Sequence, residues 1–147
     1  WPKDREKPQK ASVPSKLHSF LQEEQEKDFG YLSWEEKEIM DFTTYQQKSR
    51  ETAIYKSELK LLYPALGLAG EAGEVCEKIK KIYRDKDGEM SSNDRLDIRK
   101  ELGDVLWYIS QIACDIDVTL ASVATANLEK LRVRKENGTL HGSGDDR

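Results

Sequence analysis

The chain has 147 residues, of which 37% are hydrophobic and 35% charged, and its formal net charge is -4. This length predicts one domain, and no apolar run approaches the roughly 20 residues that a membrane span needs. No basic stripe with interleaved aromatic residues is present, so we expect no polymeric nucleic acid as a partner. The start of the chain lacks the pattern of a secretory signal, which predicts a cytoplasmic, helix-rich protein with no membrane association.

The two ends of the chain differ from its middle. The first 16 residues carry three prolines among Lys and Arg, a pattern that disfavours regular structure. Residues 1–39 are therefore predicted to be an N-terminal extension that is partly disordered. Met40 marks the expected start of a domain over 40–136, and the Gly-containing residues 137–147 predict a disordered tail.

Four helical patterns fill the expected domain, and no alternating run of strand length competes with them. Hydroxyl and carboxyl residues suited to N-capping precede the first, third and fourth patterns, and glycine follows the second and the fourth. The patterns run over about 43–58, 64–84, 91–115 and 119–137. They predict an all-α fold, an antiparallel four-helix bundle-like domain.

Three glycines, Gly67, Gly70 and Gly73, recur every three residues within the second pattern. Each costs roughly 1 kcal/mol of helix propensity relative to alanine, and close packing against another helix would offset that cost. Approach to a phosphate is the alternative, although the spacing differs from that of phosphate-cradling loops. A domain of roughly 100 residues with wide apolar faces has a thin core, so we expect homo-oligomerisation to complete it.

Both cysteines, Cys76 and Cys114, lie within helical patterns, at or near their apolar faces. Free cysteine behaves as a small hydrophobic residue, and disulfides are rare in reducing compartments. We therefore expect two reduced thiols in the core of an intracellular protein, with no disulfide framework.

Two pairs of acidic residues lie in the second and third patterns, Glu71 with Glu74 and Glu101 with Asp104. Residues three apart on a helix face the same side, and each pair borders an apolar stripe, so the carboxylates point toward another helix. Tyr108 continues the stripe of the second pair. Converging carboxylates repel in a partly dry site unless cations hold them together. We therefore predict a metal site, with solvated surface acids as the alternative.

The ligands that the sequence lacks narrow the choice of metal. Its two histidines, His18 and His141, fall outside the helical patterns. Without imidazole or paired thiolate ligands, Zn²⁺ and Fe²⁺ lack their usual donors, whereas oxygen-only sites suit Mg²⁺, with Mn²⁺ as a substitute. Mg²⁺ held by few carboxylates keeps coordination positions for substrate phosphates. The acidic residues therefore indicate phosphate chemistry.

Basic residues suited to bind phosphate lie in the second and fourth patterns. Asn127, Lys130 and Arg134 share one face of the fourth pattern, where a solvated charge stripe is the alternative interpretation. Lys78 follows Glu74 on the acidic stripe. There it can pair with Glu74 or reach a phosphate.

The sequence around these residues resembles a known family. Residues 66–75, LGLAGEAGEV, and residues 101–105, ELGDV, are similar to the two acidic motifs of the MazG-like nucleotide pyrophosphohydrolases, which are all-α NTP pyrophosphatases. The YQ pair at 45–46 and the segment NLEKLRVR at 127–134 also resemble that family. Gly70 stands where members often carry a third glutamate.

The resemblance implies hydrolysis of a (deoxy)nucleoside triphosphate to the monophosphate and pyrophosphate, in the service of nucleotide-pool cleansing or regulation. It also implies a homodimer or homotetramer. The residues implied to hold Mg²⁺ and to act in catalysis are Glu71, Glu74, Glu101 and Asp104. Those implied to bind substrate are Lys130 and Arg134 at the phosphates, Asn127 in support, and Tyr45 and Gln46 at the base or sugar.

Two alternatives stay open. One is the related helical enzyme that hydrolyses phosphoribosyl-ATP, which would share the metal site but not the substrate. The other is a non-catalytic helical interaction module whose acidic pairs are merely exposed. Release of pyrophosphate with Mg²⁺ would exclude the module, and a panel of substrates would separate the two enzymes.

Overall fold

The computed structural model describes residues 40–141. The chain divides between Ile39 and Met40, and the account below concerns the second unit alone. The predicted N-terminal extension and residues 142–147 of the predicted tail lie outside the described residues. The proposed domain limits therefore stay predictions.

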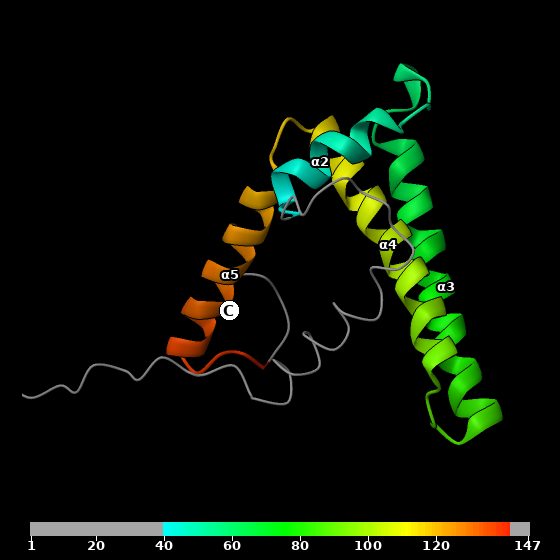
Figure 1. The fold of residues 1–147 in the computed structure, drawn as a ribbon. Coiled ribbons are helices and arrows are strands. Elements are labelled where there is room, and N and C mark those ends of the chain that lie inside the picture. The colour runs from blue at the N-terminus through cyan, green and yellow to red at the C-terminus, as the bar shows by residue number, and fades with distance from the viewer. Residues whose placement is uncertain (1–39, 142–147) are drawn as a thin grey trace, which may run out of the picture. The chain divides into compact units, whose positions relative to one another are not determined.

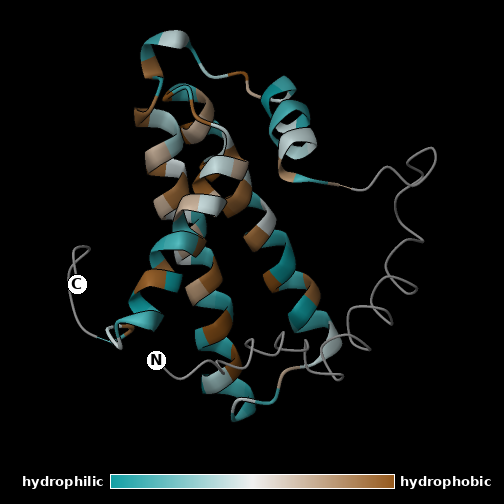
Figure 2. Ribbon diagram, turned by 90° about the vertical axis from the view of Figure 1, so that its left-hand side faces the viewer, coloured by the Kyte–Doolittle hydropathy of each residue, from teal (hydrophilic) through white to brown (hydrophobic). Residues whose placement is uncertain are grey.

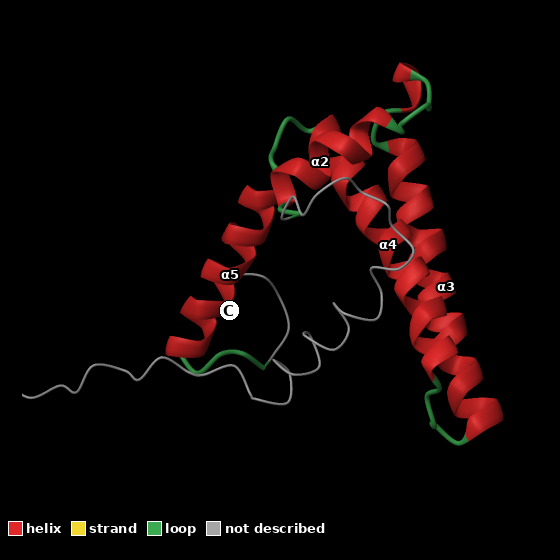
Figure 3. Cartoon of the chain, viewed as in Figure 1, coloured by secondary structure: helices red, strands yellow, loops and turns green. Residues whose placement is uncertain are grey.

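The described part of the chain consists of helices and contains no strand (Figure 3). This confirms the all-α class. Its elements in chain order are α2 (Phe42–Glu51), the short 3₁₀ helix η2 (Ser57–Leu59), α3 (Leu62–Lys86), α4 (Ser92–Asp115) and α5 (Leu120–Glu136). Three of the predicted patterns coincide with α3, α4 and α5 to within about two residues, the usual uncertainty of a helix end.

The predicted end of the first helix is wrong, because α2 stops at Glu51 rather than near Glu58. The Thr52 hydroxyl donates to the Ser49 carbonyl at 2.7 Å and accepts from the Trp107 indole at 2.7 Å. A carbonyl that would continue the helix is therefore bonded locally. The helix also begins earlier than predicted, with Asp41 as the N-cap that accepts from Thr44 N at 2.7 Å.

The carboxylate of Asp115 binds three groups in and before the connection between α2 and α3. It accepts hydrogen bonds from the Leu61 backbone N–H at 3.1 Å and from the Tyr55 hydroxyl at 2.9 Å, and it pairs with Arg50 at 3.0 Å. Leu61 has a φ of 63°, a conformation that costs a non-glycine residue about 1–3 kcal/mol. The bonds from Asp115 help to hold the chain in this conformation.

The two long helices, α3 and α4, lie side by side as an antiparallel hairpin (Figure 1). Gly88 makes the turn at a φ of 84°, where glycine is favoured. Ser91 and Asp94 form a capping box at the start of α4, and Lys86 donates to Asp94 at 2.6 Å. The end of the hairpin is thus fixed by bonds from both helices.

Helix α5 diverges from this hairpin, because α4 and α5 are bent by 101° relative to each other. Its start is held by the side-chain amide of Gln46 on α2, which donates to Val118 O at 2.9 Å and accepts from Leu120 N at 2.8 Å. No single described helix is long and apolar enough to cross a membrane, although α4 and α5 reach that length and composition as a bent pair. The four helices are compatible with a bundle, and closure by further copies stays a prediction.

The core of the described unit is small. Its buried hydrophobic residues are Ile82, Ala113 and Leu120. Ser49 and Ser110 are also buried, and their hydroxyl groups share a hydrogen bond of 2.8 Å between α2 and α4. Hydrophobic segments recur along the long helices (Figure 2), and many large apolar side chains stay exposed. Examples are Leu66, Tyr83, Leu102, Ile116, Leu128 and Leu131.

The prediction of core thiols is wrong for Cys76, which is exposed on α3. Cys114 on α4 is half-buried, and its sulfur accepts a weak hydrogen bond from the Gln46 amide at 3.4 Å. The two residues differ because α4 is covered by α2 at Cys114, whereas α3 leaves Cys76 on its open side. Both thiols are free.

Candidate metal centre

Three carboxylates from the α3–α4 hairpin converge on one point. Oxygen atoms of Glu71, Glu101 and Asp104 all lie within 4.8 Å of one another, a spacing that allows them to hold one metal ion. Glu71 and Glu101 are half-buried, and Asp104 is exposed. We refer to these three residues as the acidic cluster. All of its donors are oxygen atoms, which suits a hard divalent cation such as Mg²⁺.

The electrostatics of the acidic cluster favour a cation. Burial raises the pKa of the Glu71 carboxyl above its usual value, and neighbouring negative charges raise it further. These charges belong to Asp104, Glu74 and Glu101. A bound cation would relieve this repulsion. The donor chemistry and the charge of the site therefore fit a divalent metal.

Glu74, the fourth predicted ligand, does not belong to this group of mutually close oxygen atoms. Glu74 is exposed, although it is three residues from Glu71 on α3, the same step that separates Glu101 from Asp104 on α4. It still acts on the pKa of Glu71, which places its charge nearby. Its role as a metal ligand stays a prediction.

Lys78 pairs with the acidic cluster and not, as one predicted alternative had it, with Glu74. Its ammonium group lies 3.4 Å from a carboxylate oxygen of Glu101, and the two side chains are 37% and 14% exposed. This pair crosses from α3 to α4. It puts a cationic donor directly beside the predicted metal ligands.

The glycines of α3 serve different purposes. A methyl group at Gly67 would overlap the ring of Tyr108, so this glycine allows close packing of α3 against α4, as predicted. Gly70 and Gly73 have no heavy atom within 4 Å of the position of an added Cβ. The packing interpretation is therefore wrong for these two glycines within one chain.

Aromatic side chains border the acidic cluster on its other side. Burial raises the pKa of Tyr45, and the charge of Asp104 raises it further. Burial also raises the pKa of Tyr108, with smaller contributions from Tyr63, Glu71 and Asp104. Tyr45 was predicted as a base or sugar contact, and its nearness to the acidic cluster is compatible with that role.

Sequence reasoning missed part of this aromatic border. The ring centroids of Tyr63 and Tyr108 are 6.3 Å apart, and Trp107 contacts Tyr108 edge-on at 4.9 Å. Tyr108 lies on the same helical stripe as Glu101 and Asp104, so its spacing indicated that it would lie near these carboxylates. Tyr63 and Trp107 lie on other stripes, and their spacing did not indicate a place near the site.

Gln46 performs a task that the sequence did not indicate. Both ends of its amide are bonded to the backbone around the start of α5. Its predicted contact with the base or sugar stays a prediction. In the structure, Gln46 connects α2 to the start of α5.

The predicted phosphate-binding residues of α5 are not among the residues that the structure gathers at the acidic cluster. Asn127 and Lys130 are exposed, and Arg134 is buried. Helix α5 makes its main contacts with α2 and α4. Their predicted roles at the substrate therefore remain to be tested.

Comparison with known proteins identifies the family. Residues 61–139 match the model of the MazG nucleotide pyrophosphohydrolase domain. The chain belongs to this family. The MazG match covers α3, α4 and α5, and with them the acidic cluster, whereas α2 precedes it.

A phage protein is also similar to this MazG-family chain. This chain is 46% identical to the Gene 37 protein of Mycobacterium phage L5 over 114 residues, which cover 74% of this chain and 100% of the phage protein. No solved structure matches the chain. Membership in the MazG family supports an enzyme of the nucleotide pyrophosphohydrolase kind.

Proposed function

We propose that this protein hydrolyses (deoxy)nucleoside triphosphates to the monophosphate and pyrophosphate in the presence of Mg²⁺. The observation that carries this proposal is the convergence of Glu71, Glu101 and Asp104 within a MazG domain. Its biological role would be to cleanse or regulate nucleotide pools.

Mg²⁺ would be held by the acidic cluster, with Glu74 completing the ligand set and Mn²⁺ as a substitute. When bound, the ion supplies Lewis acidity and an activated water for attack on the α-phosphorus. The residues of the chain bind and orient the substrate around it. Lys78 would neutralise phosphate charge, and its distance of 3.4 Å from Glu101 supports this role.

Asn127, Lys130 and Arg134 would reach the phosphates in an assembly of two or four copies. Two features support this assembly: α5 diverges from the α3–α4 hairpin, and many large apolar side chains of the hairpin are exposed in one chain. Association would cover these side chains, in keeping with the apolar character of obligate homodimer interfaces. A homodimer or homotetramer is therefore part of the proposal.

A panel of nucleotides assayed for pyrophosphate release tests the proposed function. Nucleoside triphosphates should yield a monophosphate and pyrophosphate in equal amounts, and the E101Q variant should yield neither. Orthophosphate with a diphosphate would show cleavage at a different bond and would overturn the proposal. Turnover of phosphoribosyl-ATP alone would instead identify the related helical enzyme, and no turnover of any nucleotide would support an interaction module.

A further inference from the structure

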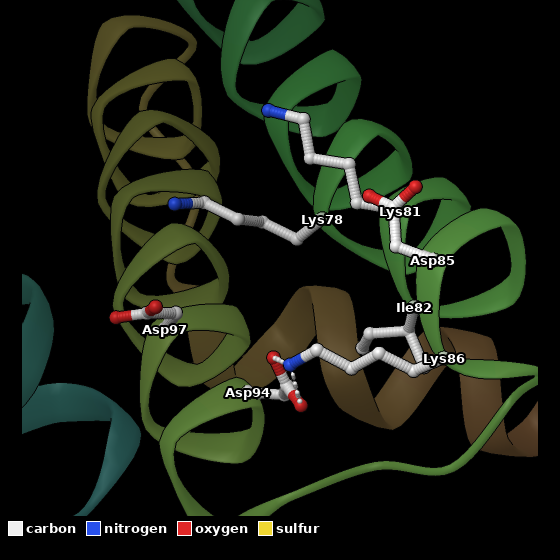
Figure 4. A pocket seen from close by; sticks show the side chains of 7 residues that line it. All are labelled: Lys78, Lys81, Ile82, Asp85, Lys86, Asp94 and Asp97. Atoms are coloured by element: carbon white, nitrogen blue, oxygen red, sulfur yellow. Dashed lines mark hydrogen bonds and ion pairs between the residues drawn. The ribbon is translucent and has the colours of Figure 1, made fainter.

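A cavity of about 290 Å³ lies between α3 and α4, on the side of the acidic cluster nearer the turn of the hairpin (Figure 4). Three lysines of α3 line it, Lys78, Lys81 and Lys86, opposite Asp94 and Asp97 of α4. Figure 4 shows Lys78 extended from α3 across to α4. The cavity and the acidic cluster thus share this lysine, whose ammonium group contacts Glu101.

The carboxylates of this cavity already have cationic partners. The three ion pairs are Asp94 with Lys86 at 2.6 Å, Asp85 with Arg84 at 2.6 Å, and Asp97 with Lys100 at 3.1 Å. Arg84 and Lys100 do not line the cavity. Each carboxylate of the wall therefore has its own cationic partner, and none of these ion pairs involves Lys78 or Lys81.

Lys78 and Lys81 are held weakly. Lys78 meets Glu101 at 3.4 Å, and Lys81 meets Glu77 at 3.4 Å on the surface, where Glu77 also bonds Lys80. The exposed Lys81–Glu77 pair contributes little to stability, and the Lys78–Glu101 pair is a single contact in which the lysine side chain is 37% exposed. A phosphate group, which forms stronger charge-assisted hydrogen bonds, can therefore replace either carboxylate as the partner of the lysine.

The opposite side of the acidic cluster has a different character. A second cavity of about 340 Å³ is lined mainly by apolar and aromatic side chains, among them Tyr55, Tyr63 and Trp107, with Lys56 as its one charged residue among those described. The rings of Tyr55 and Tyr63 stack at 5.3 Å. Such a surface suits a nucleobase, which stacks on aromatic rings for about 1–3 kcal/mol, and suits a phosphate poorly.

We propose that the substrate lies along the α3–α4 hairpin in one direction, with its pyrophosphate end at Lys78 and Lys81 and its nucleoside end at Tyr63 and Trp107. This inference rests on the proposed function and deepens it. On α3 the order is Tyr63, Glu71 of the acidic cluster, Lys78 and Lys81, so the reacting α-phosphate lies between the two cavities. The lysines then bind the leaving group, and the aromatic cavity selects the nucleoside.

Binding of inorganic pyrophosphate with Mg²⁺, measured by calorimetry, tests this direction. Hydrogen bonds to charged groups contribute about 1.5–3 kcal/mol, so K78Q should weaken pyrophosphate binding by about tenfold or more, and K78R should restore most of it. K56Q is the decisive comparison, because the reverse direction would place the phosphates at Lys56. K80Q is the matched control, since Lys80 is exposed on α3 and does not line the cavity.

We expect K56Q and K80Q to bind pyrophosphate within twofold of the unaltered protein. A loss in K56Q with normal binding in K78Q would overturn the inference, and so would equal binding by all variants or no binding by the unaltered protein. These outcomes are separate from a failure of the proposed function, which the nucleotide panel reports. Far-ultraviolet circular dichroism of each variant confirms that its helices are retained.

Discussion

Gly67 of α3 lies directly against the ring of Tyr108 of α4, and a Cβ added to Gly67 would overlap that ring, so the ring or the helix would have to shift. This contact is one helical turn from Glu71 on α3 and one turn from Asp104 on α4. The spacing between the two helices is thus set beside the acidic cluster. A substitution at Gly67 should therefore alter both the stability of the hairpin and the geometry of the metal site.

We expect Gly67→Ala to destabilise the protein by about 1–3 kcal/mol, the usual cost of overpacking. Gly70→Ala is the matched control, because open space surrounds Gly70 and alanine is the better helix former by roughly 1 kcal/mol. Thermal unfolding of the two variants measures the difference. An equal rise in melting temperature for both would contradict the close packing at Gly67.

Glu101→Gln should abolish the binding of divalent metal and reduce activity by more than about 100-fold, since even the loss of an outer-shell partner of a metal ligand costs 10–100-fold. Calorimetric titration with Mg²⁺ or Mn²⁺ measures binding without turnover. Excess EDTA should inactivate the unaltered protein, and added Mg²⁺ should restore it. Normal metal binding by the variant would remove Glu101 from the site.

Glu74→Gln tests whether Glu74, which is not among the three converging carboxylates, also binds the metal. If Glu74 completes the ligand set, the variant should bind Mg²⁺ at least about tenfold more weakly, as when a metal site loses a supporting carboxylate. Its helical content should not change, because Glu74 is exposed. Unchanged metal affinity would limit the site to the acidic cluster.

In EDTA, the free energy of unfolding should depend on pH through Glu71. Its folded-state pKa is raised above 4.5, so the native state binds more protons than the unfolded state in the window above that value. Protonation of Glu71 therefore favours folding, and stability should rise as the pH falls from 7 into this window. Denaturant titrations at several pH values should show a smaller rise in Glu71→Gln, and identical profiles would contradict the assignment.

Asp94 should have the opposite dependence. Its bonds with Lys86 and Ser91 lower its pKa from 3.8 to about 2, so its contribution is complete above pH 3.8 and is lost as the pH falls through about 2. Asp94→Asn should lower the melting temperature at pH 7, and the difference from the unaltered protein should vanish near pH 2. Asp97→Asn is the control, because Asp97 has one exposed ion pair with Lys100.

The sequence was sufficient to predict three of the four long elements. Periodicity and capping residues located α3, α4 and α5, because their ends are decided by neighbours in the chain. The end of α2 was mispredicted because Trp107 and Asp115, more than fifty residues away, hold the segment that follows it. Local signals do not contain such contacts.

The candidate site likewise has a part that the sequence predicted and a part that it did not. Helical spacing was enough to bring Glu71, Glu101 and Asp104 together, since the two helices of one hairpin pack along the stripes that carry them. The same spacing did not bring the oxygen atoms of Glu74 into this group. The aromatic cavity was not predicted, because Ile54, Tyr63 and Trp107 come from three separate segments and converge only in the folded chain.

The bonds of Asp115 have a consequence for any search for altered specificity. Tyr55 lines the aromatic cavity, yet its hydroxyl is positioned by Asp115 and Arg50, neither of which lines that cavity. Random mutagenesis selected for a new nucleotide preference should therefore recover changes at these two positions. Residues remote from the nucleoside would then tune its recognition by tilting one ring.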